Sequence, residues 1–315
     1  MSPESSRPLF VVNPRSGGGK TGATWGNLQS TIEARLGKID VVFTERTMHA
    51  ADLAKEGAEK GHPLVVAVGG DGTFNEVVNG LLSAGRPETR IGMVAQGTGG
   101  DFRKTLGFEH KLDAYLEALA SGRERKLDVG RLEYTDSSGA TQTRHFVNIL
   151  SCGMGGLVDQ YVATAPRVLG GTAAYFLSSF RGLLGSKVGR VRCRVVCDGT
   201  SEERTIHSLM IAICNGQYFG SGMHVAPMAK PDDGYFELVA LGATSKVEFA
   251  LTSSSIYSGA HMKRADTVHM RGQSFTLTLE NQEARDVYLL DLDGEPVGRL
   301  PITITLLPGA VTLRG

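Results

Sequence analysis

The sequence predicts an α/β N-terminal domain with a parallel sheet and helices on both faces, and a β-rich, largely antiparallel second domain. The first part of the chain alternates short apolar runs with helical patterns, whereas the part after residue 128 contains strand-like runs without regular helices between them. The length of 315 residues also exceeds what one small core requires. We therefore expect domains at 1–128 and 129–300, with the active site in the cleft between them.

The N-terminal domain is predicted from four strands and the helices between them. Residues 25–36, 50–60 and 77–82 show the spacing of amphipathic helices, and continuous apolar runs between them indicate buried strands. This alternation is typical of a parallel sheet, and such sheets bind ligands at the carboxyl ends of their strands. The expected strands are Leu9–Asn13, Asp40–Thr44, Leu64–Val68 and Ile91–Ala95.

The second domain is predicted from strand-like runs that end at polar turns. Two such turns are expected at 136–139 (DSSG) and 198–203 (DGTSEE), and their spacing favours a sandwich. A final apolar run, Ile302–Leu307, fits either domain. The other expected strands are Lys126–Tyr134, Arg144–Leu150, Arg190–Cys197, Thr205–Ile213, Tyr235–Leu241, Ser274–Leu279 and Val287–Leu290.

Charge and composition exclude several classes of protein. Lys and Arg together number 33, as do Asp and Glu, so no net charge directs the chain to nucleic acid. The four cysteines form no CxxC pair, and we interpret them as buried free thiols rather than as a metal site. The N-terminus lacks the apolar core of a signal peptide, and no run approaches the ~20 apolar residues of a membrane span. A cytoplasmic location is therefore expected.

Three glycine-rich loops follow predicted strands, and the first is NPRSGGGK at 13–20. Its GGGK is similar to a Walker A loop, but that motif needs Gly six residues before its Lys, where this chain has Pro14. We expect instead a strand-to-helix turn that offers backbone amides to an anion.

The second loop, GGDGT at 69–73, is the most informative stretch. Its glycines allow phosphate oxygens to approach the backbone, but the Asp71 carboxylate would repel them unless a divalent cation lay between. The loop therefore predicts magnesium; the alternative is a tight turn with a helix-capping Asp or Thr. The third loop, GTGGD at 97–101, repeats the pattern, with Thr98 placed for phosphate or ribose and Asp101 for a helix cap or the metal.

Three motifs in this order, VVNPRSGGGK, VVAVGGDGTFNEVVNGL and VAQGTGGDFRKTLG, resemble the soluble diacylglycerol kinase catalytic-domain family, which includes sphingosine and ceramide kinases and bacterial lipid kinases. The resemblance continues through FVNILSCGMGG, NGQYFGSGMHVAPMAKPDDGYFEL and LDLDGEP, and so covers nearly the whole chain. It implies an ATP-binding α/β domain, a β-rich lipid-substrate domain, and a return of residues 301–315 to the first domain.

The resemblance also implies roles for individual residues. The DGE triplet supplies the group that accepts the substrate proton, which we assign to Glu295 with Asp293 as close competitor, while Asp71 completes the catalytic set. A structural magnesium site uses the Asp233 side chain and the carbonyls of Lys230 and Tyr235. ATP contacts are implied for Asn13, Pro14, Arg15, Ser16, Gly17, Thr44, Gly69, Gly70, Asp71, Gly72, Thr73, Phe74, Asn75, Thr98 and Asp101. This chain departs from the family at Gly100, usually Asn, and at Ser221, often Gly.

The function implied is ATP- and Mg²⁺-dependent phosphorylation of a lipid hydroxyl, with diacylglycerol as the first candidate. A sphingoid base, ceramide or another lipid alcohol remains open, as do an NAD kinase and a non-catalytic lipid- or nucleotide-binding protein. The expected partner is a lipid presented by a membrane surface, with transient peripheral contact at the inner membrane; a homodimer is also compatible. An apolar stripe with flanking basic residues, within 167–190, either packs on its own domain or touches that surface.

Overall fold

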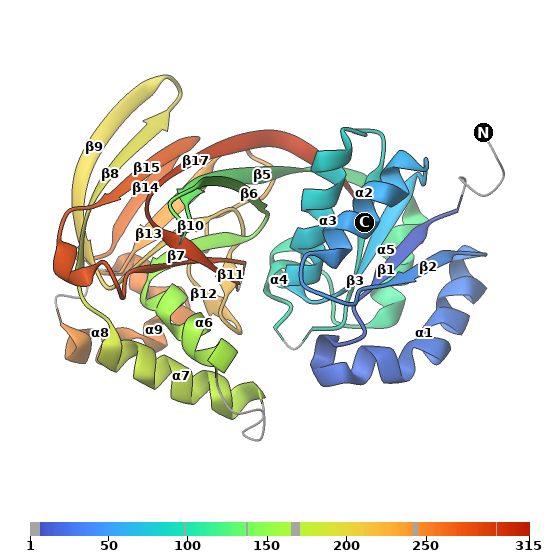
Figure 1. The fold of residues 1–315 in the computed structure, drawn as a ribbon, viewed down its shortest axis with the longest axis horizontal. Coiled ribbons are helices and arrows are strands. Elements are labelled where there is room, and N and C mark those ends of the chain that lie inside the picture. Colours follow the sequence, from blue (N-terminus) through green and yellow to red (C-terminus); the bar gives the residue numbers. More distant parts are fainter. Residues whose placement is uncertain (1–6, 98, 137, 165–170, 242–244, 294) are drawn as a thin grey trace. The chain divides into compact units, whose positions relative to one another are not determined.

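The computed structural model describes residues 7–97, 99–136, 138–164, 171–241, 245–293 and 295–315, which form two compact units (Figure 1). Unit 1 contains the described residues up to Val129, together with 231–233 and 307–315. Unit 2 contains 130–230 and 234–306. The chain therefore enters unit 1 three times, and the segment that carries PDD at 231–233 is one of these entries.

Unit 1 is built on a parallel sheet in the order β4-β3-β1-β2. Strands β1, β3 and β4 are apolar and almost wholly buried, as continuous apolar runs predict, whereas the edge strand β2 is only half-buried. The C-terminal strand joins this sheet through a parallel pair between Leu313 and Ile91. The strands are β1 (Leu9–Val12), β2 (Asp40–Phe43), β3 (Leu64–Gly69) and β4 (Arg90–Ala95).

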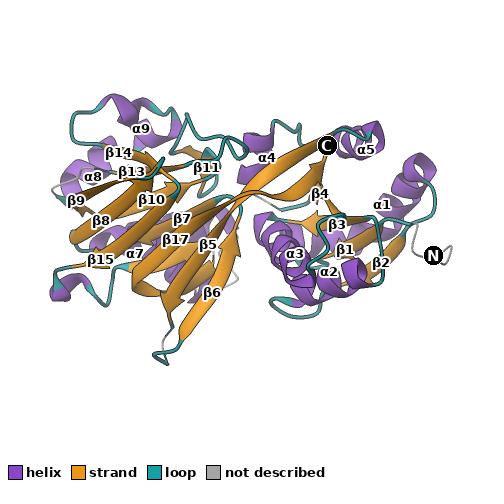
Figure 2. Ribbon diagram, turned by 90° about the horizontal axis from the view of Figure 1, so that it is seen from above, coloured by secondary structure: helices purple, strands orange, loops and turns teal. Residues whose placement is uncertain are grey.

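Helices cover both faces of this sheet. Figures 1 and 2 show α1 and α5 on one face and α2 and α3 on the other. The sequence-based prediction omitted α5, although Tyr115, Leu116 and Leu119 follow helical spacing and are buried. The helices are α1 (Lys20–Leu36), α2 (His49–Glu59), α3 (Asp71–Ala84), α4 (Asp101–Leu106) and α5 (Leu112–Ser121), with a short 3-10 turn at Ser16–Gly19.

Unit 2 is dominated by antiparallel strand pairs, in the order β14-β13-β10-β7-β16-β17 with β15, β8 and β9 continuing from β17. β5 and β6 form a hairpin that also pairs with β17. The strands are β5 (Glu124–Thr135), β6 (Thr141–Phe146), β7 (Ile149–Gly153), β8 (Gly189–Cys197), β9 (Thr200–Ser208), β10 (Met210–Cys214), β11 (Tyr218–Phe219), β12 (Met223–His224), β13 (Phe236–Ala240), β14 (Val268–Gly272), β15 (Ser274–Leu279), β16 (Leu289–Leu292) and β17 (Glu295–Arg314).

Two of the expected strands are each two strands in the structure. The run Arg144–Leu150 breaks between β6 and β7, and the run Thr205–Ile213 breaks between β9 and β10. At the second break the Ser208 hydroxyl lies 2.7 Å from the Met210 carbonyl oxygen and accepts the Met210 amide at 3.1 Å. The Ser208 side chain thus takes the place of a backbone partner for the Met210 amide where the two strands meet. Apolar periodicity does not reveal such a side-chain contact.

Alternating side chains of the unit 2 strands feed two apolar cores. On β7, Leu150 and Cys152 belong to a first core, which is made mostly of side chains from the strands of unit 2. Ile149 belongs to a second core, which also contains Phe249 and Ile256 of the helices. Helices α6 (Met154–Thr164), α7 (Gly171–Gly185), α8 (Lys246–Thr252) and α9 (Ser254–Tyr257) belong to unit 2. None of the helices in the described ranges combines the length and hydropathy needed to cross a bilayer.

Candidate active site

The three predicted loops of unit 1 lie together at the carboxyl ends of β1, β3 and β4. The Asn13 carboxamide after β1 donates to the Thr73 hydroxyl in the first turn of α3, at 3.1 Å. The Asn13 amide also donates to Val68 O on β3, at 2.9 Å. Thr44 directly follows the neighbouring strand β2, and its amide donates to Val12 O at 2.9 Å. Residues distant in sequence therefore form one edge, as the parallel sheet predicts.

Glycine is required where these loops approach one another. A Cβ at Gly97 would lie 2.7 Å from Gly70 Cα, so the second and third loops pass at a distance that no side chain permits. A Cβ at Gly17 would lie 2.8 Å from Gln96 O, and its φ of 62° is left-handed. The three loops are therefore one close-packed backbone surface.

Asp71 lies at the junction of the second and third loops. Its carboxylate accepts the Asp101 backbone amide at 2.8 Å, and the Asp101 carboxylate pairs with the Lys104 ammonium at 2.8 Å. Burial raises the pKa of Asp71, although the Asp101 amide opposes this shift. Two carboxylates share a partly buried site, and a cation would stabilise this arrangement. Oxygen donors of this kind suit Mg²⁺, so the residues fit the predicted ion.

The cap interpretation of the GGDGT loop is wrong. The N-cap of α3 is Gly70, and no side chain caps that helix, because Asp71 binds the Asp101 amide and Thr73 accepts Asn13. The N-cap of α4 is Gly100, again without a side-chain cap. The first amides of α3 are therefore not satisfied by a capping side chain, as an anion site requires.

The remaining implied ATP residues take different places in these loops. Pro14 and Arg15 follow β1, and the Ser16 hydroxyl donates to Asn13 O at 2.9 Å. Phe74 is 1% exposed, and its ring centre lies 5.5 Å from that of Phe102 at an angle of 42° between the rings, so its side chain belongs to the core. Asn75 is also buried in α3, Gly69 ends β3 and Gly72 lies in the first turn of α3. Thr98 lies outside the described residues.

Gly100 departs from the usual Asn without a change in backbone requirement. Its φ of 58° and ψ of 43° are left-handed, a conformation that both Gly and Asn adopt readily. The replacement therefore preserves the turn into α4 and removes one side-chain amide from the third loop.

Glu76 is a residue that sequence reasoning missed. From α3, its carboxylate accepts the Met48 and Ala50 amides, each at 3.0 Å, and so binds the N-terminus of α2. An acid on the otherwise buried side of α3 was the available signal. Glu76 ties the segment after β2, which includes Thr44, to the helix that carries GGDGT.

In unit 2 the hairpin of β16 and β17 carries Asp293 and Glu295 of the DGE triplet. Leu292 pairs with Glu295 across this hairpin. The Asp293 carboxylate accepts the amides of Val147, Asn148 and Ile149, at 3.1, 3.2 and 2.8 Å. Asp293 itself has a left-handed φ of 49°. Its oxygens hold the turn against the start of β7, and this explains why the strand breaks there.

Two buried asparagines complete the surroundings of this turn. Asn215 Nδ2 donates to Val147 O at 2.8 Å, and Asn148 Nδ2 donates to Tyr218 O at 2.9 Å. Asn148 is 4% exposed. Asn148 directly precedes an apolar strand run, and Asn215 directly follows one. This position was the sequence signal, but neither asparagine was predicted to belong to the site. The side chain of Glu295 lies outside the described part of the chain.

The structural magnesium site stays a prediction. Asp233 belongs to unit 1, whereas Lys230 and Tyr235 belong to unit 2. Among the described residues no three His, Cys, Asp or Glu side chains cluster as metal ligands, but two of the predicted ligands are carbonyls. The segment is held in unit 1 by Asp128, whose amide donates to Pro231 O at 2.7 Å.

Asp128 is a second residue that sequence reasoning missed. It is 3% exposed, and its carboxylate accepts the Gly309 amide at 2.7 Å. One buried acid therefore binds both the 231–233 segment and the returning C-terminal strand to unit 1. The signal was an Asp between Leu127 and Val129 in an apolar run.

Two family models match the chain. The diacylglycerol kinase catalytic domain matches residues 7–132, the span with the three glycine loops. The YegS C-terminal NAD kinase beta sandwich-like domain matches residues 148–315, the span with the DGE turn. Together these matches confirm the predicted fold class, an α/β part followed by a β-rich part.

Named relatives and solved structures agree with these matches. A Staphylococcus aureus (strain bovine RF122 / ET3-1) protein named diacylglycerol kinase is 25% identical over 297 residues, covering 94% of this chain and 88% of that protein. A crystal structure of a diacylglycerol kinase from Bacillus anthracis covers 100% of this chain and 98% of its own, with a TM-score of 0.68 and 20% identity. Yeast NADH kinase complexed with NADH covers 99% and 83%, with a TM-score of 0.50 and 9% identity. Both structures show similarity of fold alone.

Proposed function

Since this chain belongs to the diacylglycerol kinase family and is a lipid kinase, we propose that it transfers the γ-phosphate of ATP to the hydroxyl of diacylglycerol, giving phosphatidic acid. The family resemblance drawn from the glycine motifs is thereby confirmed, and ATP as phosphate donor follows from the family. The observation that carries the proposal is the junction of three glycine loops beside the Asp71 carboxylate.

The loops supply what a triphosphate needs. The uncapped amides of α3 and the glycine backbone are hydrogen-bond donors for phosphate oxygens, and the helix dipole favours negative charge at the same end. Asn13 and Thr73 hold the first loop on the second. Asp71 and Asp101 are the residues we assign to hold Mg²⁺, which neutralises charge on the phosphates when bound.

In the transfer step, the lipid hydroxyl oxygen forms a bond to the γ-phosphorus while the bond to the β–γ bridging oxygen breaks, and ADP leaves. The hydroxyl proton passes to a carboxylate of the 293–295 turn. We assign this proton to Glu295, because the Asp293 oxygens already accept three backbone amides and so position the turn. Because diacylglycerol is insoluble, we place the reaction at a membrane surface, on the inner face.

The test is a comparison of phosphate acceptors with radiolabelled ATP and the purified full chain. We expect Mg²⁺-dependent label in phosphatidic acid when diacylglycerol is offered in mixed micelles. Label in a sphingoid base or ceramide, but not in diacylglycerol, would move the assignment to another lipid alcohol. Label in NAD alone would overturn the lipid assignment, and ATP binding without turnover on any acceptor would indicate a binding protein.

A further inference from the structure

Large apolar side chains are exposed on one side of two helices in unit 2. On α7 they are Leu177, Phe180 and Leu184, at 45%, 55% and 59% exposure, and on α8 they are Val247 and Leu251, at 70% and 77%. The spacings i, i+3, i+7 and i, i+4 place each set on one face of its helix. We call these five residues the outer apolar face.

Among the side chains described at 177–186, small residues are buried and Leu183 packs against the second core. Ser178 and Ser186 are 3% and 1% exposed, and a Cβ at Gly182 would lie 2.5 Å from Val158 Cγ2 on α6. A helix that only packs on its own domain buries its large apolar side chains. Here Gly182 faces α6 and Leu183 packs against the second core, whereas Leu177, Phe180 and Leu184 are exposed. Packing within the unit therefore does not explain these three side chains.

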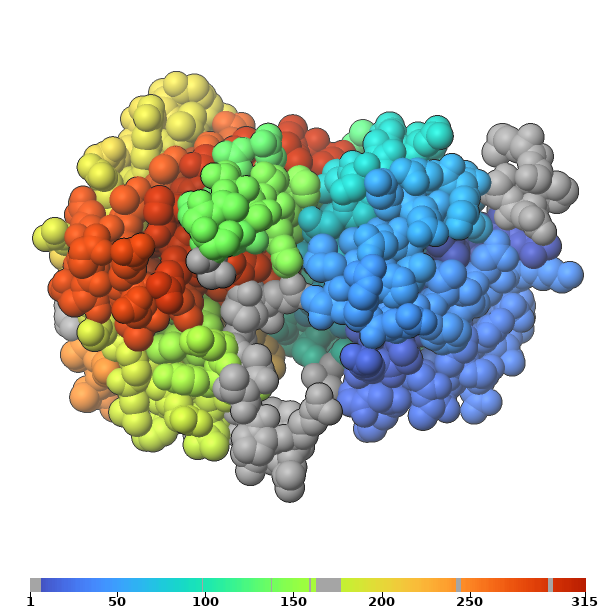
Figure 3. Space-filling view, viewed as in Figure 1, coloured from blue at the N-terminus to red at the C-terminus, as the bar shows by residue number. Residues whose placement is uncertain are grey.

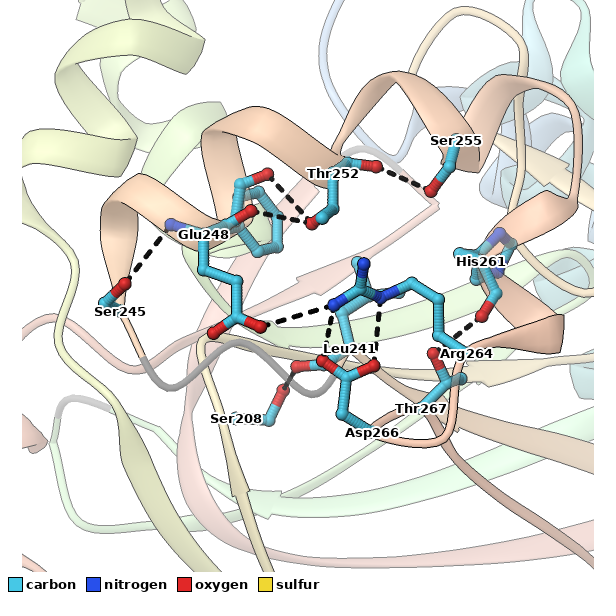
Figure 4. Close-up of polar contacts among 11 residues, drawn as sticks. Ser208, Leu241, Ser245, Glu248, Thr252, Ser255, His261, Arg264, Asp266 and Thr267 are labelled. Atoms are coloured by element: carbon cyan, nitrogen blue, oxygen red, sulfur yellow. Dashed lines mark hydrogen bonds and ion pairs between the residues drawn. The ribbon is translucent and has the colours of Figure 1, made fainter.

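Polar contacts fix α8 in the orientation that exposes its two apolar residues. Ser245 caps α8 by accepting the Glu248 amide at 3.2 Å, and the Arg264 guanidinium bridges Glu248 at 3.3 Å and Asp266 at 2.7 Å (Figure 4). Phe249 is 5% exposed and anchors the opposite side of the helix in the core. Val247 and Leu251 are therefore held outward.

The two helices are neighbours in unit 2. The Lys246 ammonium at the start of α8 donates to the Leu184 carbonyl oxygen at the end of α7. Figures 1 and 3 show α7 in yellow-green and α8 in light orange as neighbours at the lower left. The exposed apolar side chains of α7 and α8 thus belong to neighbouring helices.

Basic side chains flank the α7 part of this surface, although Arg190 pairs with Glu280 at 3.2 Å, α8 carries Glu248, and the chain as a whole is neutral. Between 171 and 190 the sequence contains Arg181, Lys187 and Arg190 and no acid. Arg181 and Lys187 are exposed, and the Arg181 guanidinium lies 5.2 Å from the centre of the Tyr161 ring. Basic side chains beside exposed apolar ones are complementary to an anionic lipid headgroup layer over hydrocarbon.

We infer that the outer apolar face is where this kinase docks on an anionic phospholipid bilayer. Its apolar side chains enter the boundary between headgroups and acyl chains, and Arg181 and Lys187 contact phosphates. The inference rests on the proposed function, since a kinase for an insoluble lipid must reach a membrane. It names the contact surface, which that function alone does not specify.

The test measures binding of the purified full chain to vesicles without ATP, so that its outcome does not depend on turnover. Vesicles of phosphatidylcholine are compared with vesicles containing phosphatidylglycerol, by co-sedimentation. We expect tighter binding to the anionic vesicles, and a loss of about tenfold or more in L177S/F180S/L184S and in V247S/L251S. Arg181→Glu should weaken only the anionic binding, whereas Arg204→Glu, on exposed β9 of the same unit, should leave most of it.

Other outcomes separate this inference from its rivals. Both serine variants should phosphorylate a short-chain, water-soluble diacylglycerol at the wild-type rate. If the wild type does not phosphorylate it at all, the proposed function fails, whereas the vesicle result stands. Equal vesicle binding by wild type and variants overturns the inference. So does a wild-type dimer that becomes monomeric in L177S/F180S/L184S while vesicle binding persists, because the face would then bind a second copy of the chain.

Discussion

The backbone amide of Asp101 donates a 2.8 Å hydrogen bond to the carboxylate of Asp71, which joins the first residues of α4 and α3. This contact brings two acidic residues from two glycine loops into one partly buried site. Such a site is costly for the free protein and useful only when a cation shares it.

The cost at Asp71 has a pH signature. Burial raises the pKa of Asp71 above 3.8, so the carboxyl contributes stability that is present below the unfolded pKa and lost as pH rises through the folded pKa. Asp71→Asn, which keeps an oxygen acceptor for the Asp101 amide, should therefore raise the urea midpoint at pH 7, with a smaller gain toward pH 4. Turnover and apparent Mg²⁺ affinity should fall, by about a hundredfold in kcat.

Asp113→Asn is the matched control, because Asp113 is an exposed acid in the first turn of α5. It should change neither the pH dependence of stability nor the Mg²⁺ titration. An Asp71→Asn protein with an unaltered Mg²⁺ titration would contradict the metal assignment, whatever its stability.

The contact between the second and third loops predicts a steric effect. Gly97→Ala places a Cβ at 2.7 Å from Gly70 Cα, so the loops must separate. We expect a loss of about 1–3 kcal/mol in unfolding free energy and weaker ATP binding, measured by calorimetry. Gly26→Ala is the control, because nothing lies within 4 Å of its Cβ in the middle of α1. That variant should gain up to about 1 kcal/mol without a change in ATP binding.

The 293–295 turn predicts different effects for its two acids. Glu295→Gln should leave the unfolding midpoint unchanged and lower kcat by about 10²–10⁴, as loss of a proton acceptor does. Asp293→Asn should lower stability by about 1–3 kcal/mol as well as kcat, because an amide group cannot accept all three amides of 147–149. Full activity in Glu295→Gln would reassign the proton to Asp293.

The cysteines predict one accessible thiol. Cys152, Cys193 and Cys214 are buried, and burial raises the pKa of Cys152 and of Cys193 to about 12. Cys197 is partly exposed, and desolvation and then the Asp198 carboxylate raise its pKa. A disulfide reagent should label one thiol in the native protein, faster from pH 7 to 9, and the other three about a hundredfold more slowly. Rapid labelling that survives Cys197→Ser would refute this.

The sequence by itself determined the parallel sheet of unit 1 and the family. Each β strand of that sheet is a continuous apolar run followed by a helix, and the glycines of 69–73 and 97–101 stand directly after two of them. These signals are local, because strand burial, helix spacing and turn residues act over a few positions. The same locality explains the hairpin at DGE, because Asp-Gly between apolar runs is a common hairpin signal.

Only the tertiary structure decided which residues hold these loops and what faces outward. Asp128, Glu76 and Asp293 each accept amides from segments 26 to 181 positions away, and no periodicity records such partners. The sequence left open whether the stripe on α7 packs on its own domain or faces outward; in the structure α6 approaches the helix at Gly182, and Phe180 is in solvent. Hydrophobic spacing defines a face of a helix; the size of the residues that meet across a contact determines which face is buried.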